Sequence, residues 1–117
     1  MTIRTRKEKP ASAEKKEYHS PSSGIFFRVK SLLYQDQSAY QKIEVIENEH
    51  FGRILLLDGL VQTTERDEFF YHEMLVHPAF VSHHLPESIL VIGGVDGGAL
   101  KEILRYPIKY ACMVEIY

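Results

Sequence analysis

Apolar and polar side chains alternate at the end of residues 25–30 and through residues 41–47, as they do in antiparallel strands that turn one face to a core. The alternation is clearest around Ile43 and Val45, which share one face of an expected strand. Asp58 and Gly59 form a dipeptide that is typical of a tight hairpin turn. We therefore expect an antiparallel meander of about three or four strands. The expected strands are residues 25–30, 41–47, 53–57 and 60–64.

The hydrophobic period becomes helical at Thr64. Thr64 and Asp67 resemble a capping box with Asp in place of the usual Glu, and neighbouring acids suit the positive end of a helix dipole. Pro78 is expected to kink or restart this helix. Four side chains then recur on one face at the spacing of an amphipathic helix. They are Phe70, Met74, His77 and Val81.

The last third of the chain predicts a βαβ unit. Residues 88–92 form a continuous apolar run, which is typical of a buried parallel strand. Residues 93–98 form a glycine-rich turn, and residues 99–104 favour a helix that ends near Pro107. Residues 111–116 have the pattern of a second buried strand. A strand, a glycine loop, a helix and a strand in this order are the parts of a nucleotide-binding crossover.

The glycine loop suggests a ligand site beside the helix that follows it. Glycines allow the backbone to approach a ligand closely at a helix N-terminus. Glu115 follows Gly93 at the end of the next expected strand, where an acidic side chain can accept hydrogen bonds from ribose hydroxyls. The alternative is a structural turn and an unrelated surface glutamate.

Asp96 narrows the chemistry of this ligand. A carboxylate in the middle of the loop would repel the pyrophosphate of a dinucleotide. The same carboxylate would attract an ammonium or sulfonium centre, so the loop favours an adenosyl-sulfonium compound over NAD. The alternative role of Asp96 is an N-cap of the following helix, and both roles can coexist.

The composition is that of one soluble globular domain. The chain has 117 residues, of which 44% are hydrophobic and 26% charged, which excludes wholesale disorder and collagen-like repeats. No apolar run approaches the roughly 18–20 residues of a membrane helix, so no membrane partner is expected. Cys112 is the single cysteine, which excludes an intrachain disulfide and favours a reducing, cytoplasmic location. The net charge of -2 argues against a nucleic-acid partner.

Charge is unevenly distributed along the chain. Basic residues outnumber acidic ones in residues 1–20, whereas acidic residues outnumber basic ones in the remainder. The first stretch has few large apolar residues and is closed by Ser-Pro-Ser-Ser-Gly at residues 20–24. We therefore predict a flexible tail over residues 1–24, with an arm for an anionic partner as the alternative. The excess of acidic residues in the rest of the chain weakly favours a cationic ligand.

His72 and His77 superficially resemble the histidine pair of a zinc-protease helix. That motif needs histidines four residues apart, and five residues turn an α-helix by about 500°, so these two rings point about 140° apart. We therefore expect no metal site.

Four segments of the chain together form a family signature. They are residues 51–59, residues 62–69 (Gln-Thr-Thr-Glu-Arg-Asp-Glu-Phe), residues 71–74 (Tyr-His-Glu-Met) and residues 93–98 (Gly-Gly-Val-Asp-Gly-Gly). They resemble the spermidine synthase (polyamine aminopropyltransferase) family, and the resemblance covers about residues 25–117. It implies an N-terminal β-domain followed by a Rossmann-like, methyltransferase-type domain. It also implies transfer of an aminopropyl group from decarboxylated S-adenosylmethionine to putrescine or a related amine.

The resemblance also implies a role for each matching residue. Gln41 would contact the nucleoside product methylthioadenosine, and Glu115 would hold its ribose. Asp96 would bind the ammonium of the aminopropyl group. Tyr71 and His72 would form the polyamine site, with Gln62 lining the same region, and the loop glycines would be Gly93, Gly94, Gly97 and Gly98.

Simpler roles are available for three of these residues. Tyr71 could be a core aromatic residue, and Gln41 an ordinary exposed strand residue. His72 could make a routine helical pair with Glu68, four residues before it.

The sequence departs from the family at three places. Val95 replaces a loop glycine, and Tyr117 stands where the family usually has Asp. The chain also ends where family members continue, and the proton acceptor of the family lies beyond Tyr117. We therefore expect an N-terminal fragment with no catalytic residue of its own.

The expected fold class is α/β, with an N-terminal antiparallel β-meander domain followed by the start of a Rossmann-like, methyltransferase-type fold. The expected divisions are a tail (residues 1–24), the β-domain (25–64) and the first helix with the βαβ unit of the nucleoside-binding domain (65–117). The partners would be small polyamine and adenosyl-sulfonium substrates and further copies of the chain. Decarboxylated S-adenosylmethionine would be a co-substrate, without any permanently bound cofactor.

Three hypotheses about function stay open at this stage. The first is an aminopropyltransferase of which this chain is the N-terminal part. The second is a noncatalytic relative that binds a ligand or promotes oligomerisation. The third is another enzyme on the same scaffold, such as an amine N-methyltransferase.

Overall fold

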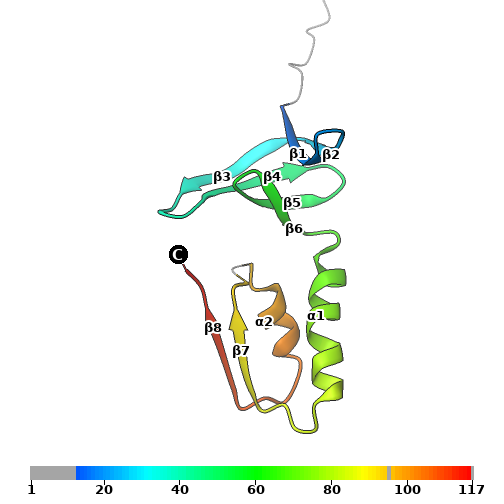
Figure 1. The fold of residues 1–117 in the computed structure, drawn as a ribbon, viewed down its shortest axis with the longest axis vertical. Coiled ribbons are helices and arrows are strands. Elements are labelled where there is room, and N and C mark those ends of the chain that lie inside the picture. Colours follow the sequence, from blue (N-terminus) through cyan, green and yellow to red (C-terminus); the bar gives the residue numbers. More distant parts are fainter. Residues whose placement is uncertain (1–12, 95, 117) are drawn as a thin grey trace, which may run out of the picture.

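The computed structural model describes residues 13–94 and 96–116, which fold into two layers joined through α1 (Figure 1). An N-terminal β-region lies over a small α/β unit, and the end of β6 leads directly into α1. The elements within the described residues are β1 (Glu14–Ser20), β2 (Ser23–Arg28), β3 (Ser31–Gln37), β4 (Lys42–Asn48), β5 (Gly52–Leu57), β6 (Leu60–Thr64), α1 (Glu68–Ser82), β7 (Ser88–Ile92), α2 (Gly98–Ile103) and β8 (Tyr110–Val114).

Strands β1 and β2 form an antiparallel hairpin, so the prediction of a flexible tail is wrong for residues 14–24. The sequence of β1 is polar and therefore has no hydrophobic pattern that predicts a strand. The strand is stabilised by its hydrogen-bond ladder with β2 and by contacts of its charged side chains. Lys15 forms an ion pair with Glu44 of β4 at 2.7 Å. Glu17 accepts a hydrogen bond from the backbone N–H of Val61 at 2.8 Å. Residues 1–12 of the expected tail lie outside the described residues.

Strands β3, β4, β5 and β6 form an antiparallel sheet in sequential order, as a meander requires. The predicted strands at 41–47, 53–57 and 60–64 are confirmed to within a residue. The expected first strand, β2, pairs with β1 instead, and β3 occupies the edge beside β4. Strand β3 escaped prediction because six of its seven residues are exposed and impose no core periodicity.

The two faces of this sheet pack against different parts of the chain. Ile46, Ile54 and Leu56 are buried on the face that packs against Phe27 of the hairpin. Ile43 and Val45 do share a face, but it is the opposite, half-buried one. This second face of the sheet is directed toward the α/β unit and therefore covers the region in which a ligand site can form.

Helix α1 begins after Asp67 and continues through Pro78 without restarting. The Thr64 hydroxyl lies 2.5 Å from a carboxylate oxygen of Asp67. The Asp67 N–H also donates to the Thr64 hydroxyl at 3.4 Å, as in a capping box. The N-cap residue of α1 is Asp67 and not Thr64, so these two contacts join the end of β6 to the start of α1. No helix in the described ranges is long and apolar enough to cross a membrane.

The core face of α1 is formed by His72, Val76 and Phe80. The face predicted from the spacing of Phe70 and Met74 is largely exposed, with 66% and 71% of these two residues accessible. Phenylalanine occurs on both sides of this helix, since Phe70 is exposed and Phe80 is buried, so spacing alone does not identify the side that meets α2.

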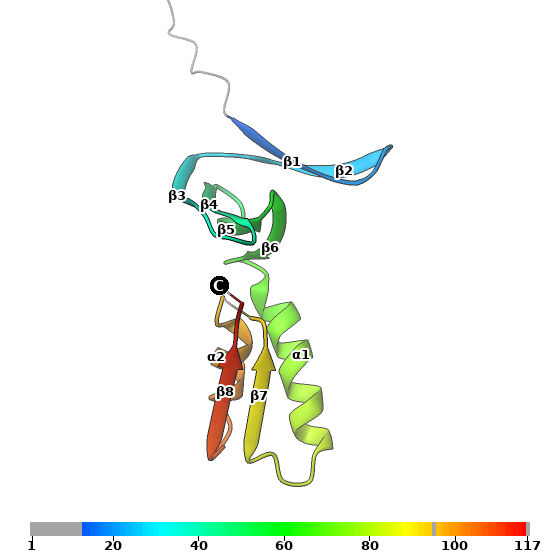
Figure 2. The same cartoon turned by 60° about the vertical axis from the view of Figure 1, so that its left-hand side comes forward.

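Strands β7 and β8 are parallel and are connected by α2, which confirms the βαβ unit. Both helices lie on one face of this pair (Figure 2), and Val76, Phe80 and Ile103 form its core with the inward side chains of β7. The opposite face is bare: Leu90 is 60% exposed and Ile92 83%. The prediction of two fully buried strands is therefore wrong for the described chain.

Candidate functional site

A hollow of about 460 Å³ lies between the β3–β6 sheet, the start of α1, the glycine loop and the end of β8. It collects residues that are far apart in the sequence, because β7 and β8 both end beneath the sheet (Figure 1). The predicted site residues that line it are Gln41, Gln62, Tyr71, His72, Gly93, Gly94, Asp96 and Glu115.

The glycine loop is shaped by backbone angles that favour glycine. Gly93, Gly94 and Gly97 have φ values of 79°, 97° and 74°, in the left-handed region that costs other residues conformational energy. The Gly93 N–H donates to the Val114 carbonyl at 2.9 Å and ties the loop to β8. Val95 and Tyr117, the two substitutions noted in the sequence, lie outside the described residues.

Asp96 is held at the beginning of α2. The N-cap residue of α2 is Gly97 and not Asp96, so the N-cap alternative is wrong as stated. The Asp96 Oδ1 nevertheless accepts a hydrogen bond from the Gly98 N–H at 2.9 Å and so satisfies an open helix donor. Its Oδ2 lies 3.3 Å from His72 Nε2 and belongs to the wall of the hollow. The two oxygens thus have separate partners, and a structural role of Asp96 leaves room for a binding role.

The His72 ring is buried, with only 4% of the residue exposed. Its Nδ1 lies 2.5 Å from Glu68 Oε2, which confirms the helical pair expected at this spacing. The ring also rests directly on Gly98: a Cβ at that position would come within 2.0 Å of the imidazole Cε1. Glycine is required at position 98 because the His72 ring leaves no space for a Cβ. At position 97 glycine is favoured because the backbone φ is positive.

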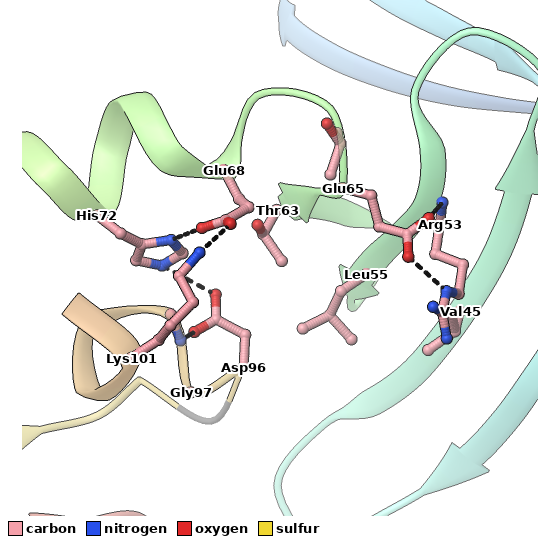
Figure 3. Close-up of a pocket in the computed structure, with 12 residues that line it drawn as sticks. Val45, Arg53, Leu55, Thr63, Glu65, Glu68, His72, Asp96, Gly97 and Lys101 are labelled. Carbon is pink, nitrogen blue, oxygen red and sulfur yellow. Dashed lines mark hydrogen bonds and ion pairs between the residues drawn. The ribbon is translucent and has the colours of Figure 1, made fainter. Parts of the chain in front are cut away.

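Glu68 connects His72 to Lys101 of α2 (Figure 3). Its second carboxylate oxygen accepts a hydrogen bond from the Lys101 ammonium. This hydrogen bond is the largest cause that lowers the pKa of the Glu68 carboxyl below its ordinary value, and the one with His72 is the second. The hydrogen bond with Glu68 in turn raises the pKa of Lys101. Sequence reasoning missed both residues as site members. Helical spacing signals Glu68, but Lys101 is 33 residues away and has no sequence signal.

A second hollow, of about 510 Å³, lies on the other side of His72 and Asp96 (Figure 3). Val45 and Leu55 of the half-buried sheet face form part of its wall. His72, Asp96 and Leu55 line both hollows, so these side chains form the partition between them.

The remaining predicted residues lie around the rim of the first hollow. Tyr71 is 67% exposed, so it is not a core aromatic residue, and its ring meets the His72 ring edge to face at 5.3 Å. Gln62 donates its amide to the Leu60 carbonyl at 3.1 Å. Gln41 donates its backbone N–H to Ser38 Oγ at 3.1 Å. Glu115 accepts from the Ile116 N–H at 2.9 Å.

Glu73, His77 and Glu102 bring potential metal-ligand atoms within 4.8 Å of one another. These atoms already have partners. Glu102 accepts from Arg105 at 2.8 Å and lies 3.1 Å from His77 Nε2, while His77 Nδ1 lies 2.7 Å from the Tyr106 hydroxyl. A metal ion would have to displace these contacts, so the cluster is better explained as a polar brace between α1 and α2.

Two family models match consecutive parts of the chain. Residues 15–65 match the spermidine synthase tetramerisation domain. Residues 68–116 match the spermine/spermidine synthase domain. The division between the two matches coincides with the connection from β6 to α1.

Curated relatives and solved structures agree with these matches. A polyamine aminopropyltransferase of a Hydrogenobaculum species is 50% identical over 77% of this chain and 32% of its own length. The Thermococcus kodakarensis polyamine aminopropyltransferase is 48% identical over 86% of this chain and 35% of its own.

A spermidine synthase crystallised with the transition-state analogue AdoDATO superposes with a TM-score of 0.87 at 38% identity, over 90% of this chain and 36% of that one. The Thermotoga maritima spermidine synthase gives a TM-score of 0.86 at 39% identity, over 89% of this chain and 38% of that one. The chain therefore spans about a third of the length of these relatives.

Proposed function

The chain belongs to the spermidine synthase family, and from this premise we propose that it is the N-terminal part of a polyamine aminopropyltransferase. The observation that carries the proposal is the convergence of Gln41, Asp96 and Glu115 on one hollow beside a glycine loop. These residues lie on the β-sheet, the loop and the end of β8. Their types match the nucleoside, ammonium and ribose groups of an adenosyl-sulfonium substrate.

The proposed reaction forms one C–N bond and breaks one C–S bond. A neutral amine nitrogen attacks the aminopropyl carbon next to the sulfonium, and the electron pair of the broken bond goes to sulfur. Methylthioadenosine leaves as a neutral thioether, and the attacking nitrogen becomes a secondary ammonium, so the one proton released is the one that the acceptor amine loses before attack. Holding donor and acceptor in line supplies much of the rate of such a transfer.

The walls of the hollow suit both substrates. Asp96 offers a carboxylate to the ammonium of the aminopropyl group, and Glu115 offers one to the ribose hydroxyls. Tyr71, His72 and Gln62 line the same hollow, which supports assigning them to the acceptor amine. Apolar side chains between these polar groups fit the methylene segments of both molecules. They are Leu55, Leu57, Leu75 and Ile92.

We assign the catalytic base to a part of the protein beyond Tyr117. A primary alkylamine has a pKa near that of lysine, about 10.4, so an amine that attacks at neutral pH must first lose a proton. The assignment is supported by the family resemblance, which implies a proton acceptor later in the sequence than the described strands. We also propose the domain boundary at residues 64 and 65, between the β-domain and the nucleoside-binding domain.

The match to a tetramerisation domain supports assembly of several copies through the β-region. The single cysteine supports a cytoplasmic location. Decarboxylated S-adenosylmethionine would be a co-substrate and not a resident cofactor.

Calorimetric titration with methylthioadenosine tests the proposal. The protein would be a chimaera that joins this chain to the part of the Hydrogenobaculum relative beyond its aligned residues. Asp96→Ala combined with Glu115→Ala should weaken binding by about a hundredfold, because two charged hydrogen-bond acceptors are lost. The matched control is Glu14→Ala with Glu49→Ala, which removes two exposed carboxylates outside the hollow. Equal binding by the Asp96 and Glu115 variant would contradict the proposal.

A further inference from the structure

The His72 imidazole is fixed on three sides by neighbouring groups. Its face rests on the Gly98 backbone, its Nδ1 edge meets Glu68 at 2.5 Å, and its Nε2 edge faces Asp96 at 3.3 Å. Two of these contacts come from the glycine loop and the start of α2, and one comes from the previous turn of α1 (Figure 3). A ring held in this way presents one defined nitrogen to the first hollow, which contains the proposed amine site.

Glu68 determines which nitrogen that is. The Lys101 ammonium donates a hydrogen bond to Glu68 and lowers the pKa of this carboxyl, so the carboxylate is ionised at neutral pH and can only accept hydrogen bonds. His72 Nδ1 must therefore carry the proton that lies between the two groups. The Nε2 edge is then the one directed at Asp96 and the ligand.

Lys101 keeps Glu68 in this arrangement. The lysine side chain is 52% exposed, whereas that of Glu68 is 23% exposed, so the ammonium lies between the carboxylate and solvent. The positive charge of the lysine also offsets the negative charge of Glu68, one of the two carboxylates that flank the imidazole. Without it, Glu68 could rotate toward water and leave Nδ1 without an acceptor.

We propose that Glu68, supported by Lys101, is a positioning residue of the amine site, which orients His72 through its Nδ1. The proposal rests on the proposed function for its catalytic consequence, but the orientation of the ring is a property of this chain alone. It extends the site from the lining of the hollow to a Lys101–Glu68–His72–Asp96 series of contacts across two helices and the loop.

Nitrogen-15 NMR of the histidine rings in the full 117-residue chain tests the orientation directly. The His72 signals are identified by their loss in His72→Gln. In the unchanged chain, Nδ1 should give a protonated signal, with a proton shared with Glu68. Glu68→Gln should shift this signal, because an amide can either accept from or donate to Nδ1. Lys101→Met, at an exposed position, should shift it in the same direction by a smaller amount.

The matched control is Glu73→Gln, the same substitution on the same helix. The Glu73 side chain is 43% exposed and belongs to the cluster around His77. It should move His77 signals and leave those of His72 unchanged. If Glu68→Gln leaves His72 Nδ1 as in the unchanged chain, Glu68 does not orient this ring and the proposal is wrong.

Steady-state kinetics of the chimaera test the consequence for the amine. Glu68→Gln should raise the KM for putrescine by about three- to tenfold, because binding must then order the His72 ring, with a smaller change in kcat. An equal fall in kcat with no change in KM would overturn the positioning role. Absence of transfer by the unsubstituted chimaera would contradict the proposed function, and the NMR result would still decide whether Glu68 orients His72.

Discussion

At the scale of the residue, the site depends on side chains that restrict one another. Gly98 is a clear case, because the His72 ring occupies the place where its Cβ would be. Gly98 lies in the loop motif, and only the folded structure shows that a ring from α1 is the reason for a glycine there.

Gly98→Ala should therefore destabilise the chain by about 1–3 kcal/mol through overpacking, as measured by urea denaturation. The same substitution in a His72→Ala background should cost much less, because the ring that blocks the methyl group is gone. An equal loss of unfolding free energy in both backgrounds would show that a group other than His72 causes the destabilisation by the added methyl group in Gly98→Ala.

Glu44 shows how a buried charge is tolerated in the β-region. The residue is 2% exposed, on the face of β4 that packs against the hairpin. Burial raises the pKa of its carboxyl, but the hydrogen bonds and charges of Lys15 and Lys42 outweigh burial, and the pKa is lowered overall. The ionised form is thus the one that the fold stabilises.

The stability from Glu44 should be present above its ordinary pKa of 4.5 and disappear as the pH falls through the lowered value. Urea midpoints measured from about pH 7 to about pH 3 should fall less steeply for Glu44→Gln than for the unchanged chain. Glu49→Gln, which removes an exposed glutamate from the turn after β4, should retain the full slope. Parallel slopes for all three proteins would exclude this role of Glu44.

At the scale of the element, α1 presents aromatic side chains on opposite faces. Phe80 is 8% exposed and stacks on Tyr106, whereas Phe70 lies on the exposed face. The periodicity of the sequence predicted the helix correctly, but it favoured the wrong face. The core face instead consists of His72, Val76 and Phe80.

Phe80→Ala should lower the free energy of unfolding by about 3–5 kcal/mol, since it leaves a cavity in the core of the α/β unit. Phe70→Ala is the matched control and should cost less than about 1 kcal/mol. Chemical denaturation monitored by circular dichroism measures both. A cost of Phe70→Ala close to that of Phe80→Ala would mean that the exposed face is covered in solution.

At the scale of the whole molecule, the chain leaves much apolar surface uncovered. The face of β7 and β8 opposite the helices carries Leu90, Ile92 and Val114, all more than half exposed. Within residues 13–94 and 96–116, each strand of this two-stranded sheet also has an unpaired edge. Surfaces of this kind promote association.

The isolated chain should therefore associate at micromolar concentration, and light scattering should give a mass above that of the monomer. It should also form no spermidine from putrescine and decarboxylated S-adenosylmethionine by mass spectrometry, because the proposed base is absent. A monodisperse monomer would contradict the first expectation. Turnover above an enzyme-free blank would contradict the second, since it would require a base within residues 1–117.

The sequence by itself determined the local elements and the residue types of the site. The hairpin turn at Asp58–Gly59, the change from strand to helix between Thr64 and Glu68, and the glycine loop follow from interactions between near neighbours. The order of strand, loop, helix and strand also placed Asp96 and Glu115 near each other, because the carboxyl ends of neighbouring parallel strands meet at one edge.

Only the tertiary structure decided which surfaces meet. The pairing of β1 with β2, the burial of Glu44 beneath Lys15, the choice of the His72 face of α1 and the approach of Lys101 to Glu68 all join segments through contacts that local patterns do not encode. Their free energies depend on partners that are distant in the sequence. Residues such as Lys15 and Lys101 look like ordinary surface charges until the fold supplies the carboxylates that they bind.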